Sequence, residues 1–479
     1  MSDVVKLSRL RGREPLEARL ASLGVEIPLD AQVEPDGPLA EPWEVAGRRV
    51  GNRFAALPME GWDASGDGRP TELVRRRWQR FGASGAKLVW GGEAYAIRAE
   101  GRANPSQLAR NPASDRDLAG LHELLVSAHA HHCGGSGDLL TGLQLTHSGR
   151  FSRPRGAPAP RTAFRHPILD RRVGIDSDAA LLADAELDDL IGDYAAVARL
   201  AREAGFGFVD VKACHGYLVH ELLSARERPG PYGGDLAGRS RFLRRAVAAV
   251  RREAPELAVG VRLSVFDLHP FRAGDDGVGR PEPCAHRPFG ASADGLGFDL
   301  AETHALVEAL AEAGVTLLCT TAGSPYYNPH CQRPAFYPPS DGYRPPEDPL
   351  VGVARQLHAT RELVRRHPEL CFVGSGYTYL QEWLPHAAQA VIRGGGAHTV
   401  GLGRMMLSYP ELPGDVLAGR SLQRGKVCRT FSDCTTAPRN GLVSGCYPID
   451  PFYKRRTEAQ ALAEVKQRAR GTRADAAAP

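Results

Sequence analysis

Two glycine-rich turns in the C-terminal half of the chain have the composition of a phosphate site. The first, VGSGYTY, contains Gly374 and Gly376, and the second, VGLGRMML, contains Gly403 next to Arg404. Glycine lets backbone N–H groups approach a phosphate closely, and arginine offers a fork of donors to phosphate oxygens. Each turn alone is typical of an ordinary loop. Two of them after neighbouring strands, one with an arginine, favour a phosphorylated cofactor.

Two polar side chains lie within otherwise apolar runs. Gln144 belongs to GLQLTHSGR, and Arg262 lies inside VGVRLS. A buried arginine must meet an anion or a strong acceptor, because an unpaired buried charge is strongly disfavoured. Two interpretations stay open for Arg262. It forms a buried ion pair with Asp or Glu, or it lies beside the N1/O2 edge of a flavin ring, where the reduced flavin carries negative charge.

The elements that must position these residues alternate between strand and helix. Amphipathic helices are predicted at Asp184–Ala204, Arg239–Arg252, Leu300–Ala313 and Gly352–Arg366. Eight buried parallel strands alternating with helices favour an α/β fold that closes into a TIM (β/α)₈ barrel. The two glycine-rich turns then follow the seventh and eighth strands, where barrels usually bind phosphate. The predicted strands are Arg53–Pro58, Lys87–Trp90, Thr141–Leu145, Phe208–Lys212, Ala258–Ser264, Thr316–Thr320, Cys371–Val373 and Thr399–Leu402.

Segments outside this repeat flank or interrupt the barrel. We expect an N-terminal extension over residues 1–45, the barrel over 46–420 and a C-terminal tail over 421–479. Two long irregular segments, residues 266–298 and 322–349, follow the fifth and sixth strands. Because loops at the C-terminal ends of barrel strands surround the active site, we expect both to cover it as a lid.

The bulk composition excludes several classes of protein. The chain has 479 residues, 42% of them apolar, and a formal net charge of +4, which gives no reason to expect nucleic acid or a membrane as partner. No apolar run is long enough to span a bilayer, and the N-terminus lacks the apolar core of a secretory signal. Nine cysteines, mostly scattered, are typical of a reduced, cytoplasmic protein. We expect a small-molecule substrate, and a homo-oligomer is left open.

Several longer motifs resemble one family, the old yellow enzyme superfamily. NRFAALPME and GGEAYAIRAEGR resemble its first and second strand segments, and QLTHSGR resembles its third. The block VDVKACHGYLVHELLSARERPGPYGGDLAGRSRFL resembles the family's most specific signature, and VGVRLS and GLGRMMLSYPEL its fifth and eighth strands. The similarity runs from about Pro42 to Leu417. The clustered C-terminal cysteines are most similar to the 2,4-dienoyl-CoA reductase and trimethylamine dehydrogenase branch, of which we expect the barrel domain only.

The resemblance implies an FMN site and a reaction over the flavin ring. Tyr217 would donate the proton that completes reduction of an activated C=C bond, and His215 would belong to the pair that binds a substrate oxygen. The implied FMN contacts are Pro58, Met59 and Ala94 through backbone, Gln144 at the pyrimidine edge, Arg262 at N1/O2, and Gly374, Gly376, Gly403 and Arg404 at the phosphate.

Two positions depart from the family pattern. Lys212 stands where the family commonly has His or Tyr in the substrate-binding pair, and the chain has only six lysines, since arginine supplies almost all its positive charge. A retained lysine indicates a compact point charge that polarises a substrate carbonyl together with His215; a strand-end lysine without a role is the other interpretation. Glu60 stands near the flavin edge, where it is either paired, with Lys212 as the candidate, or solvated.

The tail contains three cysteines at positions where cluster-bearing relatives have four. Cys428, Cys434 and Cys446 are present, and Phe431 occupies the second place of the usual set. Three thiolates are one short of an iron–sulfur site. The sequence therefore disfavours an iron–sulfur cluster and favours ordinary buried thiols, with a bound metal as the open alternative.

We therefore expect an FMN-dependent oxidoreductase that oxidises NADH or NADPH and reduces an electron-poor alkene. A flavoenzyme that oxidises an amine or an alicyclic substrate is the second interpretation. A flavin-free lyase that forms a Schiff base on Lys212 is the third, and a non-catalytic flavin-binding protein is the fourth. The substrate, the reaction direction and the choice between NADH and NADPH stay open at this point.

Overall fold

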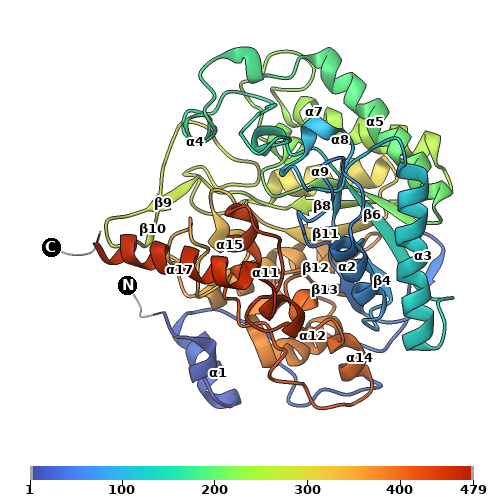
Figure 1. The fold of residues 1–479 in the computed structure, drawn as a ribbon, viewed down its shortest axis with the longest axis vertical. Helices are drawn as coiled ribbons and strands as arrows, with labels where there is room; N and C mark the ends of the chain where they lie inside the picture. Colours follow the sequence, from blue (N-terminus) through green and yellow to red (C-terminus); the bar gives the residue numbers. More distant parts are fainter. Residues whose placement is uncertain (1–3, 476–479) are drawn as a thin grey trace.

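Eight parallel strands close into a barrel in the computed structural model, which describes residues 4–475 and the side chains up to residue 469 (Figure 1). The order around the barrel is β4-β3-β13-β12-β11-β8-β7-β6, and a β4–β6 pairing closes it. A ninth strand, β5 (Ala94–Ala96), pairs with β6 beyond β4. The predicted TIM barrel is confirmed, with all eight strands at the expected places. They are β3 (Phe54–Ala56), β4 (Leu88–Val89), β6 (Leu140–Thr146), β7 (Phe208–Ala213), β8 (Ala258–Ser264), β11 (Leu317–Thr321), β12 (Cys371–Gly374) and β13 (Thr399–Leu402).

Helices connect successive strands and cover the outside of the barrel. In α8, Phe242, Leu243, Ala246, Val247 and Val250 recur at helical spacing and are buried, while arginines occupy the outer face. The four amphipathic helices expected from the sequence are present, with ends shifted by up to three residues. The main helices are α2 (Glu72–Gly82), α3 (Ser114–Cys133), α5 (Asp184–Glu203), α8 (Arg241–Glu253), α9 (Ala301–Glu312), α11 (Pro349–Arg366), α12 (Leu384–Arg393) and α14 (Leu412–Leu417).

Two of the apolar clusters among the described residues make up the core of the barrel. The larger lies between the strands and the surrounding helices. The smaller fills the inside of the barrel, where the rings of Trp90 and Phe208 meet edge to face at 4.9 Å. An antiparallel hairpin of β1 (Trp43–Val45) and β2 (Arg48–Val50) contributes Trp43, Val45 and Val50 to this inner core. The hairpin therefore closes one end of the barrel and leaves the other end for function.

Shorter elements lie in the N-terminal segment and in the loops between the strands and helices of the barrel. They are η1 (Leu7–Arg9), α1 (Arg13–Ser22), η2 (Ala99–Gly101), η3 (Gly149–Phe151), α4 (Leu169–Val173), η4 (Asp178–Ala180), α6 (Leu218–Leu222), α7 (Leu236–Arg239), β9 (Phe271–Ala273), β10 (Gly279–Pro281), α10 (Pro329–Gln332), η5 (Tyr377–Trp383) and α13 (Met405–Ser408). None of the helices among residues 4–475 has the length and apolarity needed to cross a bilayer.

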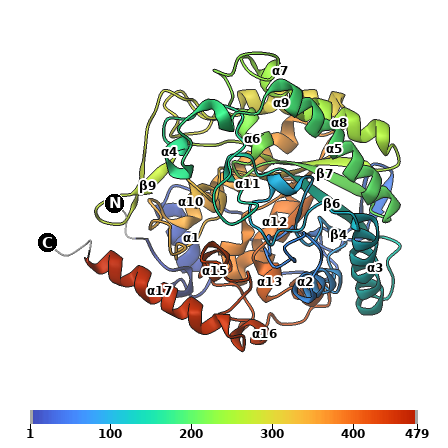
Figure 2. The same cartoon turned by 45° about the horizontal axis from the view of Figure 1, so that its top comes forward.

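The C-terminal tail folds back onto the barrel. It contains α15 (Asp433–Arg439), α16 (Pro451–Lys454) and α17 (Glu458–Asp475). Both views show α17 as a long helix on the outside of the molecule, while α15 lies closer to its centre (Figure 1, Figure 2). Asp450 accepts hydrogen bonds from Arg76 and Arg80 of α2, each at 2.8 Å, which anchors the tail to the barrel. The tail is thus part of the same packed unit as the strands.

Candidate active site

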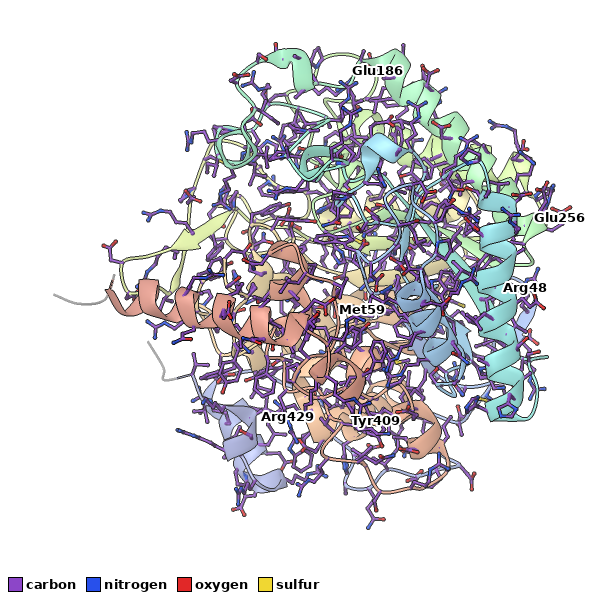
Figure 3. The ribbon with its side chains drawn as sticks, viewed as in Figure 1. Arg48, Met59, Glu186, Glu256, Tyr409 and Arg429 are labelled. Carbon is purple, nitrogen blue, oxygen red and sulfur yellow. The ribbon has the colours of Figure 1, made fainter. Side chains whose placement is uncertain are left out.

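A cavity opens at the C-terminal ends of the barrel strands. It encloses about 1080 Å³ of empty space, a figure that includes space open to the solvent. Met59, one of its lining residues, lies near the middle of the molecule, whereas Glu186 and Glu256 lie at the periphery (Figure 3). The cavity brings together ten residues singled out in the sequence: Pro58, Met59, Glu60, Lys212, His215, Tyr217, Arg262, Gly376, Gly403 and Arg404.

Three other candidate residues lie behind the cavity wall rather than on it. Gln144 of β6 is fully buried and is paired in register with Ala94 of β5. Gly374 is the last residue of β12, and a side chain there would meet the Tyr377 hydroxyl at 2.9 Å. Gly374 precedes the lining residue Ser375 in the chain. Gln144 is linked to the cavity through Asp210, which also accepts from the backbone N–H of the lining residue Arg262.

A buried carboxylate organises the floor of the cavity. Asp210 of β7 is fully buried and accepts hydrogen bonds at 2.6 Å from Gln144 Nε2, Trp90 Nε1 and the backbone N–H of Arg262. Burial raises the pKa of Asp210, and these hydrogen bonds act in the opposite direction. Because one acceptor holds both Gln144 and Arg262, the two residues expected at the flavin edge are fixed relative to each other.

The arginine on the floor has a free donor. Arg262 is 7% exposed, and its Nε has no hydrogen-bond partner among the described residues. Asp210 binds the Arg262 backbone N–H, and the described part of the chain contains no salt bridge within 4.0 Å of the guanidinium. A buried cationic N–H without an acceptor is unusual in native proteins, so Arg262 is suited to an anionic or strongly polar ligand in the cavity.

An ion pair lies at the strand end next to this floor. Lys212 Nζ donates to Glu60 Oε1 at 2.9 Å, and the lysine side chain is only 3% exposed. The ammonium lies 4.3 Å from the centre of the Tyr217 ring, a distance at which a cation is attracted by the ring face. Of the two interpretations of Glu60 the geometry thus favours pairing. Phe208, Asp210 and Lys212 share one strand face, as alternation along β7 predicts.

His215 is held in a strained turn after β7. Its backbone φ is +68°, a region that residues with side chains seldom adopt. Its backbone N–H donates to Ser264 Oγ at 3.2 Å, and its carbonyl accepts from Ser324 Oγ at 2.9 Å. The Gln332 amide lies 3.3 Å from His215 Nε2. Burial holds the pKa of His215 well below its usual value, so the imidazole is neutral near pH 7.

Tyr217 forms a hydroxyl pair with a second tyrosine. The Tyr217 and Tyr326 hydroxyl oxygens are 2.9 Å apart. Phe151 stacks on the Tyr326 ring at 4.0 Å with an interplanar angle of 7°, and the Arg439 guanidinium lies 5.6 Å from the same ring. Burial raises the pKa of Tyr217 well above its usual value and that of Tyr326 to about 12. Both phenols therefore stay protonated at neutral pH, and Tyr217 has a proton to give.

The glycine-rich turns meet at the far end of the cavity. Gly376 has φ +97°, which favours glycine, and a side chain there would meet the Gln356 amide oxygen at 2.9 Å. A Cβ atom at Gly403 would lie 3.3 Å from Met59 Sδ. Arg404 follows it and is 9% exposed; its Nη1 has no partner among the described residues. This end thus combines close backbone access with an incompletely bonded cation.

The sequence did not single out several residues of the cavity wall. Trp62, Tyr326, Gln332 and Arg333 line it, the last three from the segment 322–349 that was expected to act as a lid. The segment 266–298 lines a separate cavity instead. In its place α15 of the tail contributes Cys434, Thr435, Pro438 and Arg439. Because 322–349 has no periodic pattern, only its content of aromatic and basic residues signalled this role.

The three tail cysteines surround a smaller cavity that Arg404 shares. It contains about 340 Å³ of empty space, and Cys428, Cys434 and Cys446 all line it. Burial raises the pKa of Cys428 to about 11 and raises the pKa of the other two thiols. Phe431 is 37% exposed and packs 5.4 Å from Tyr337. Within the part of the chain that the structure describes, no group of three or more His, Cys, Asp or Glu residues has the arrangement of a metal site.

Comparison with known families places this geometry in context. Residues 38–277 match the model of the NADH:flavin oxidoreductase / NADH oxidase family. An NADPH dehydrogenase of Geobacillus sp. (strain WCH70) is 30% identical over 239 residues, which cover 48% of this chain and 64% of that protein. The putative 12-oxophytodienoate reductase-like protein 1 of Arabidopsis thaliana is 35% identical over 144 residues, 27% of this chain and 44% of that protein. The chain therefore spans less than two thirds of these relatives.

Solved structures of low sequence identity share the fold. A 2-naphthoyl-CoA reductase in complex with 2-naphthoyl-CoA has a TM-score of 0.66 at 18% identity, over 88% of this chain and 58% of that one. Histamine dehydrogenase from Rhizobium sp. 4-9 has a TM-score of 0.63 at 18% identity, over 88% of this chain and 53% of that one. These likenesses extend the barrel match beyond residue 277 and concern the fold alone.

Proposed function

The chain belongs to the NADH:flavin oxidoreductase / NADH oxidase family, and from that premise we propose that it is an FMN-dependent oxidoreductase that uses NADH or NADPH to reduce an electron-poor C=C bond. The observation that carries this proposal is the hydroxyl of Tyr217. It is a buried, protonated phenol beside a neutral imidazole and an ammonium, at the mouth of the barrel. This set suits proton delivery to a polarised alkene.

The residues of the cavity fit FMN. Gln144 and Arg262, both fixed by Asp210, would bind the pyrimidine edge of the ring. The unpartnered Nε of Arg262 supplies a donor and a positive charge where reduced flavin is negative. Gly376, Gly403 and Arg404 would hold the phosphate, since Arg404 Nη1 is buried without an acceptor among the described residues. When bound, FMN supplies the transfer of a hydride from NAD(P)H to the alkene.

The protein's own groups would polarise the substrate. His215 and Lys212 are placed to donate hydrogen bonds to a carbonyl oxygen conjugated with the alkene, which draws electrons from the double bond. Glu60 accepts from Lys212 at 2.9 Å and so fixes the ammonium and offsets its charge. Gln332, within 3.3 Å of His215 Nε2, orients the imidazole.

Proton delivery falls to the two tyrosines. Tyr217 would give its hydroxyl proton to the carbon α to the carbonyl, which is general acid catalysis. Tyr326, 2.9 Å from the Tyr217 oxygen, would then return a proton to it. Phe151 and Arg439 both contact the Tyr326 ring and so restrain the direction of its hydroxyl. The names of the relatives, an NADPH dehydrogenase and a 12-oxophytodienoate reductase-like protein, support this direction of reaction.

The other interpretations fit the geometry less well. A Schiff-base lyase requires an unprotonated lysine, whereas Lys212 donates to the carboxylate of Glu60 in an ion pair. Oxidation of amines is supported by histamine dehydrogenase only through a shared fold at 18% identity. The pair Tyr217–Tyr326 has no comparable use in removing electrons from an amine.

Anaerobic stopped-flow absorbance of the FMN-reconstituted protein tests the proposal. NADH or NADPH should bleach the flavin, and an α,β-unsaturated ketone or aldehyde should restore its colour. The reductive interpretation would be overturned by protein that takes up no FMN. It would equally be overturned by reduced protein that no activated alkene reoxidises while amines bleach the oxidised form.

A further inference from the structure

Three arginines meet on the side of the cavity that the tail forms. Arg333 comes from the segment after β11, Arg404 follows β13, and Arg439 ends α15; all three line the cavity. Arg439 has acceptors, because it donates to the two oxygens of Asp341 at 2.8 and 2.9 Å and to Pro325 O at 2.6 Å. The other two have far fewer.

Arg333 is the least satisfied cation of the group. It is 8% exposed, and its Nη1 donates to Thr435 Oγ1 at 2.7 Å. Its Nε and Nη2 are buried and have no hydrogen-bond partner within residues 4–469. Arg404 Nη1 is in the same condition, while Arg404 Nη2 donates to Pro334 O at 3.0 Å. Because Pro334 is the residue after Arg333, the two guanidinium groups are neighbours.

The positive charges of Arg333 and Arg404 are not balanced by a carboxylate among the described residues. Burial, together with the positive charges of Arg439 and Arg404, lowers the pKa of Arg333 to about 9. Burial also lowers the pKa of Arg404. Two buried, adjacent cations with three unbonded donor atoms are disfavoured unless an anion lies between them. Asp341 pairs with Arg439, and the free N–H groups of Arg333 and Arg404 have no such carboxylate partner among the described residues.

We propose that Arg333 and Arg404 form a two-arginine clamp for one doubly charged oxyanion, a phosphate monoester. The inference rests on the proposed function, in which the ligand is the phosphate of FMN. A phosphate monoester carries about −1.5 to −2 charge at pH 7, so one arginine leaves it half neutralised and two balance it. Planar guanidinium groups match phosphate oxygens with paired N–H donors. Gly376 and Gly403, on the same wall, leave room for backbone N–H donors.

The tail has a defined part in this clamp. The hydroxyl of Thr435 on α15 is the acceptor that fixes Arg333. The neighbouring Thr436 accepts from the backbone N–H of Ser340 at 3.2 Å, which ties α15 to the same segment that carries Arg333. The geometry thus makes the tail a positioning element for ligand binding at the barrel.

The test compares FMN with riboflavin, which lacks the phosphate. Dissociation constants are measured by quenching of flavin fluorescence with the full-length apoprotein and its Arg333→Gln variant. We expect FMN affinity to fall about 10- to 100-fold, the effect of losing hydrogen bonds to a charged group, and riboflavin affinity to stay within about twofold. Arg424→Gln is the matched control, because Arg424 is 82% exposed and the substitution removes the same charge outside the cavity.

A second variant and a second ligand separate the sources of the oxyanion. Thr435→Val should weaken FMN in the same direction but less, since it removes only the acceptor that fixes Arg333. If Arg333→Gln changes FMN affinity no more than riboflavin affinity, inorganic phosphate is titrated into the FMN-loaded protein. Binding that perturbs the flavin spectrum and is lost in Arg333→Gln supports the clamp, with a free or substrate phosphate as its ligand.

The clamp is overturned if neither FMN affinity nor phosphate binding responds to Arg333→Gln while riboflavin still binds and so reports a folded site. That result would leave the proposed reaction intact. Conversely, protein that binds FMN through Arg333 but is not bleached by NADH or NADPH would contradict the proposed reaction and leave the clamp standing.

Discussion

Replacing Tyr217 by Phe removes one hydroxyl and leaves the ring, so it isolates proton delivery from the shape of the site. The ring contact with the Lys212 ammonium at 4.3 Å is retained, because attraction to a ring face does not need the hydroxyl. The variant loses the hydrogen bond to Tyr326 at 2.9 Å, which contributes about 1 kcal/mol to stability. The protein should therefore fold and bind FMN nearly as before.

The expected loss in rate is far larger than this loss in stability. General acid catalysis by a positioned group contributes about 10²- to 10⁴-fold, or about 3–5 kcal/mol in the barrier. Only the step that protonates the alkene should slow by this factor. Since burial holds the pKa of Tyr217 well above its usual value, the phenol stays protonated, and the rate of this step in the unmodified protein should be flat between pH 6 and 9.

Stopped-flow absorbance separates the two halves of the cycle. In Tyr217→Phe the bleaching of the flavin by NAD(P)H should keep its rate, whereas reoxidation by an enone should slow by the factor above. Tyr326→Phe keeps the donor and removes only its hydroxyl partner, so it should slow reoxidation by about 2- to 10-fold, the effect of one hydrogen bond. Equal rates of reoxidation in the Tyr217→Phe variant and the unmodified protein would refute the assignment of Tyr217 as donor.

Three further predictions follow from buried charges and can be checked on the purified protein. Glu60→Gln leaves the positive charge of Lys212 unpaired beside the flavin and should raise the flavin reduction potential by on the order of 30 mV, which is about 1.4 kcal/mol for a two-electron couple. Equilibration with a reference dye measures the potential. An unchanged or lowered potential would contradict the prediction. Asp210→Asn places an amide among three hydrogen-bond donors and should lower the free energy of unfolding by about 3 kcal/mol. Chemical denaturation measures this loss, and a smaller loss of stability would argue against an ionised Asp210. Burial lowers the pKa of His147 and His330 to about 3, so below pH 6.5 the unfolded chain binds protons that the folded chain does not. Lowering the pH from 6.5 to 5.0 should therefore reduce the free energy of unfolding by about 3 kcal/mol for the two histidines together. A melting temperature independent of pH over this range would contradict this prediction.

The barrel was predictable because its strands are buried on both faces and therefore appear in the sequence as short apolar runs. The run Ala258–Ser264 is predicted and observed with the same bounds. The helices around the barrel were predictable for a related reason: α5 places apolar residues at helical spacing against the strands. The strands that were not predicted are β1, β2, β5, β9 and β10, and each of them is three residues long. Elements of that length carry too few residues to show a period.

The site was predictable only where it coincides with strand ends. Lys212 and Arg262 stand out because a charge inside an apolar run requires a partner, and the strand order then brings both to one cavity. The partner of Lys212, Glu60, lies 152 residues away in sequence. The family resemblance offered this pairing as one of two alternatives, and the fold was needed to choose between them. Tyr326 and Arg333 lie in an irregular segment whose path depends on packing against the tail, so their contacts follow from tertiary structure alone.

The tail shows why the composition of a segment is a poor guide to its part in a site. Three cysteines and an apolar Phe431 favour buried thiols, and burial does raise the pKa of those thiols. Yet α15 also contributes a hydroxyl and a guanidinium to the cavity through Thr435 and Arg439. Arg439 packs against Tyr326, which holds the hydroxyl of Tyr217. A change in the seating of α15 would therefore act on phosphate binding and on proton delivery together, and a variant that loosens the tail should lose both before it loses the fold of the barrel.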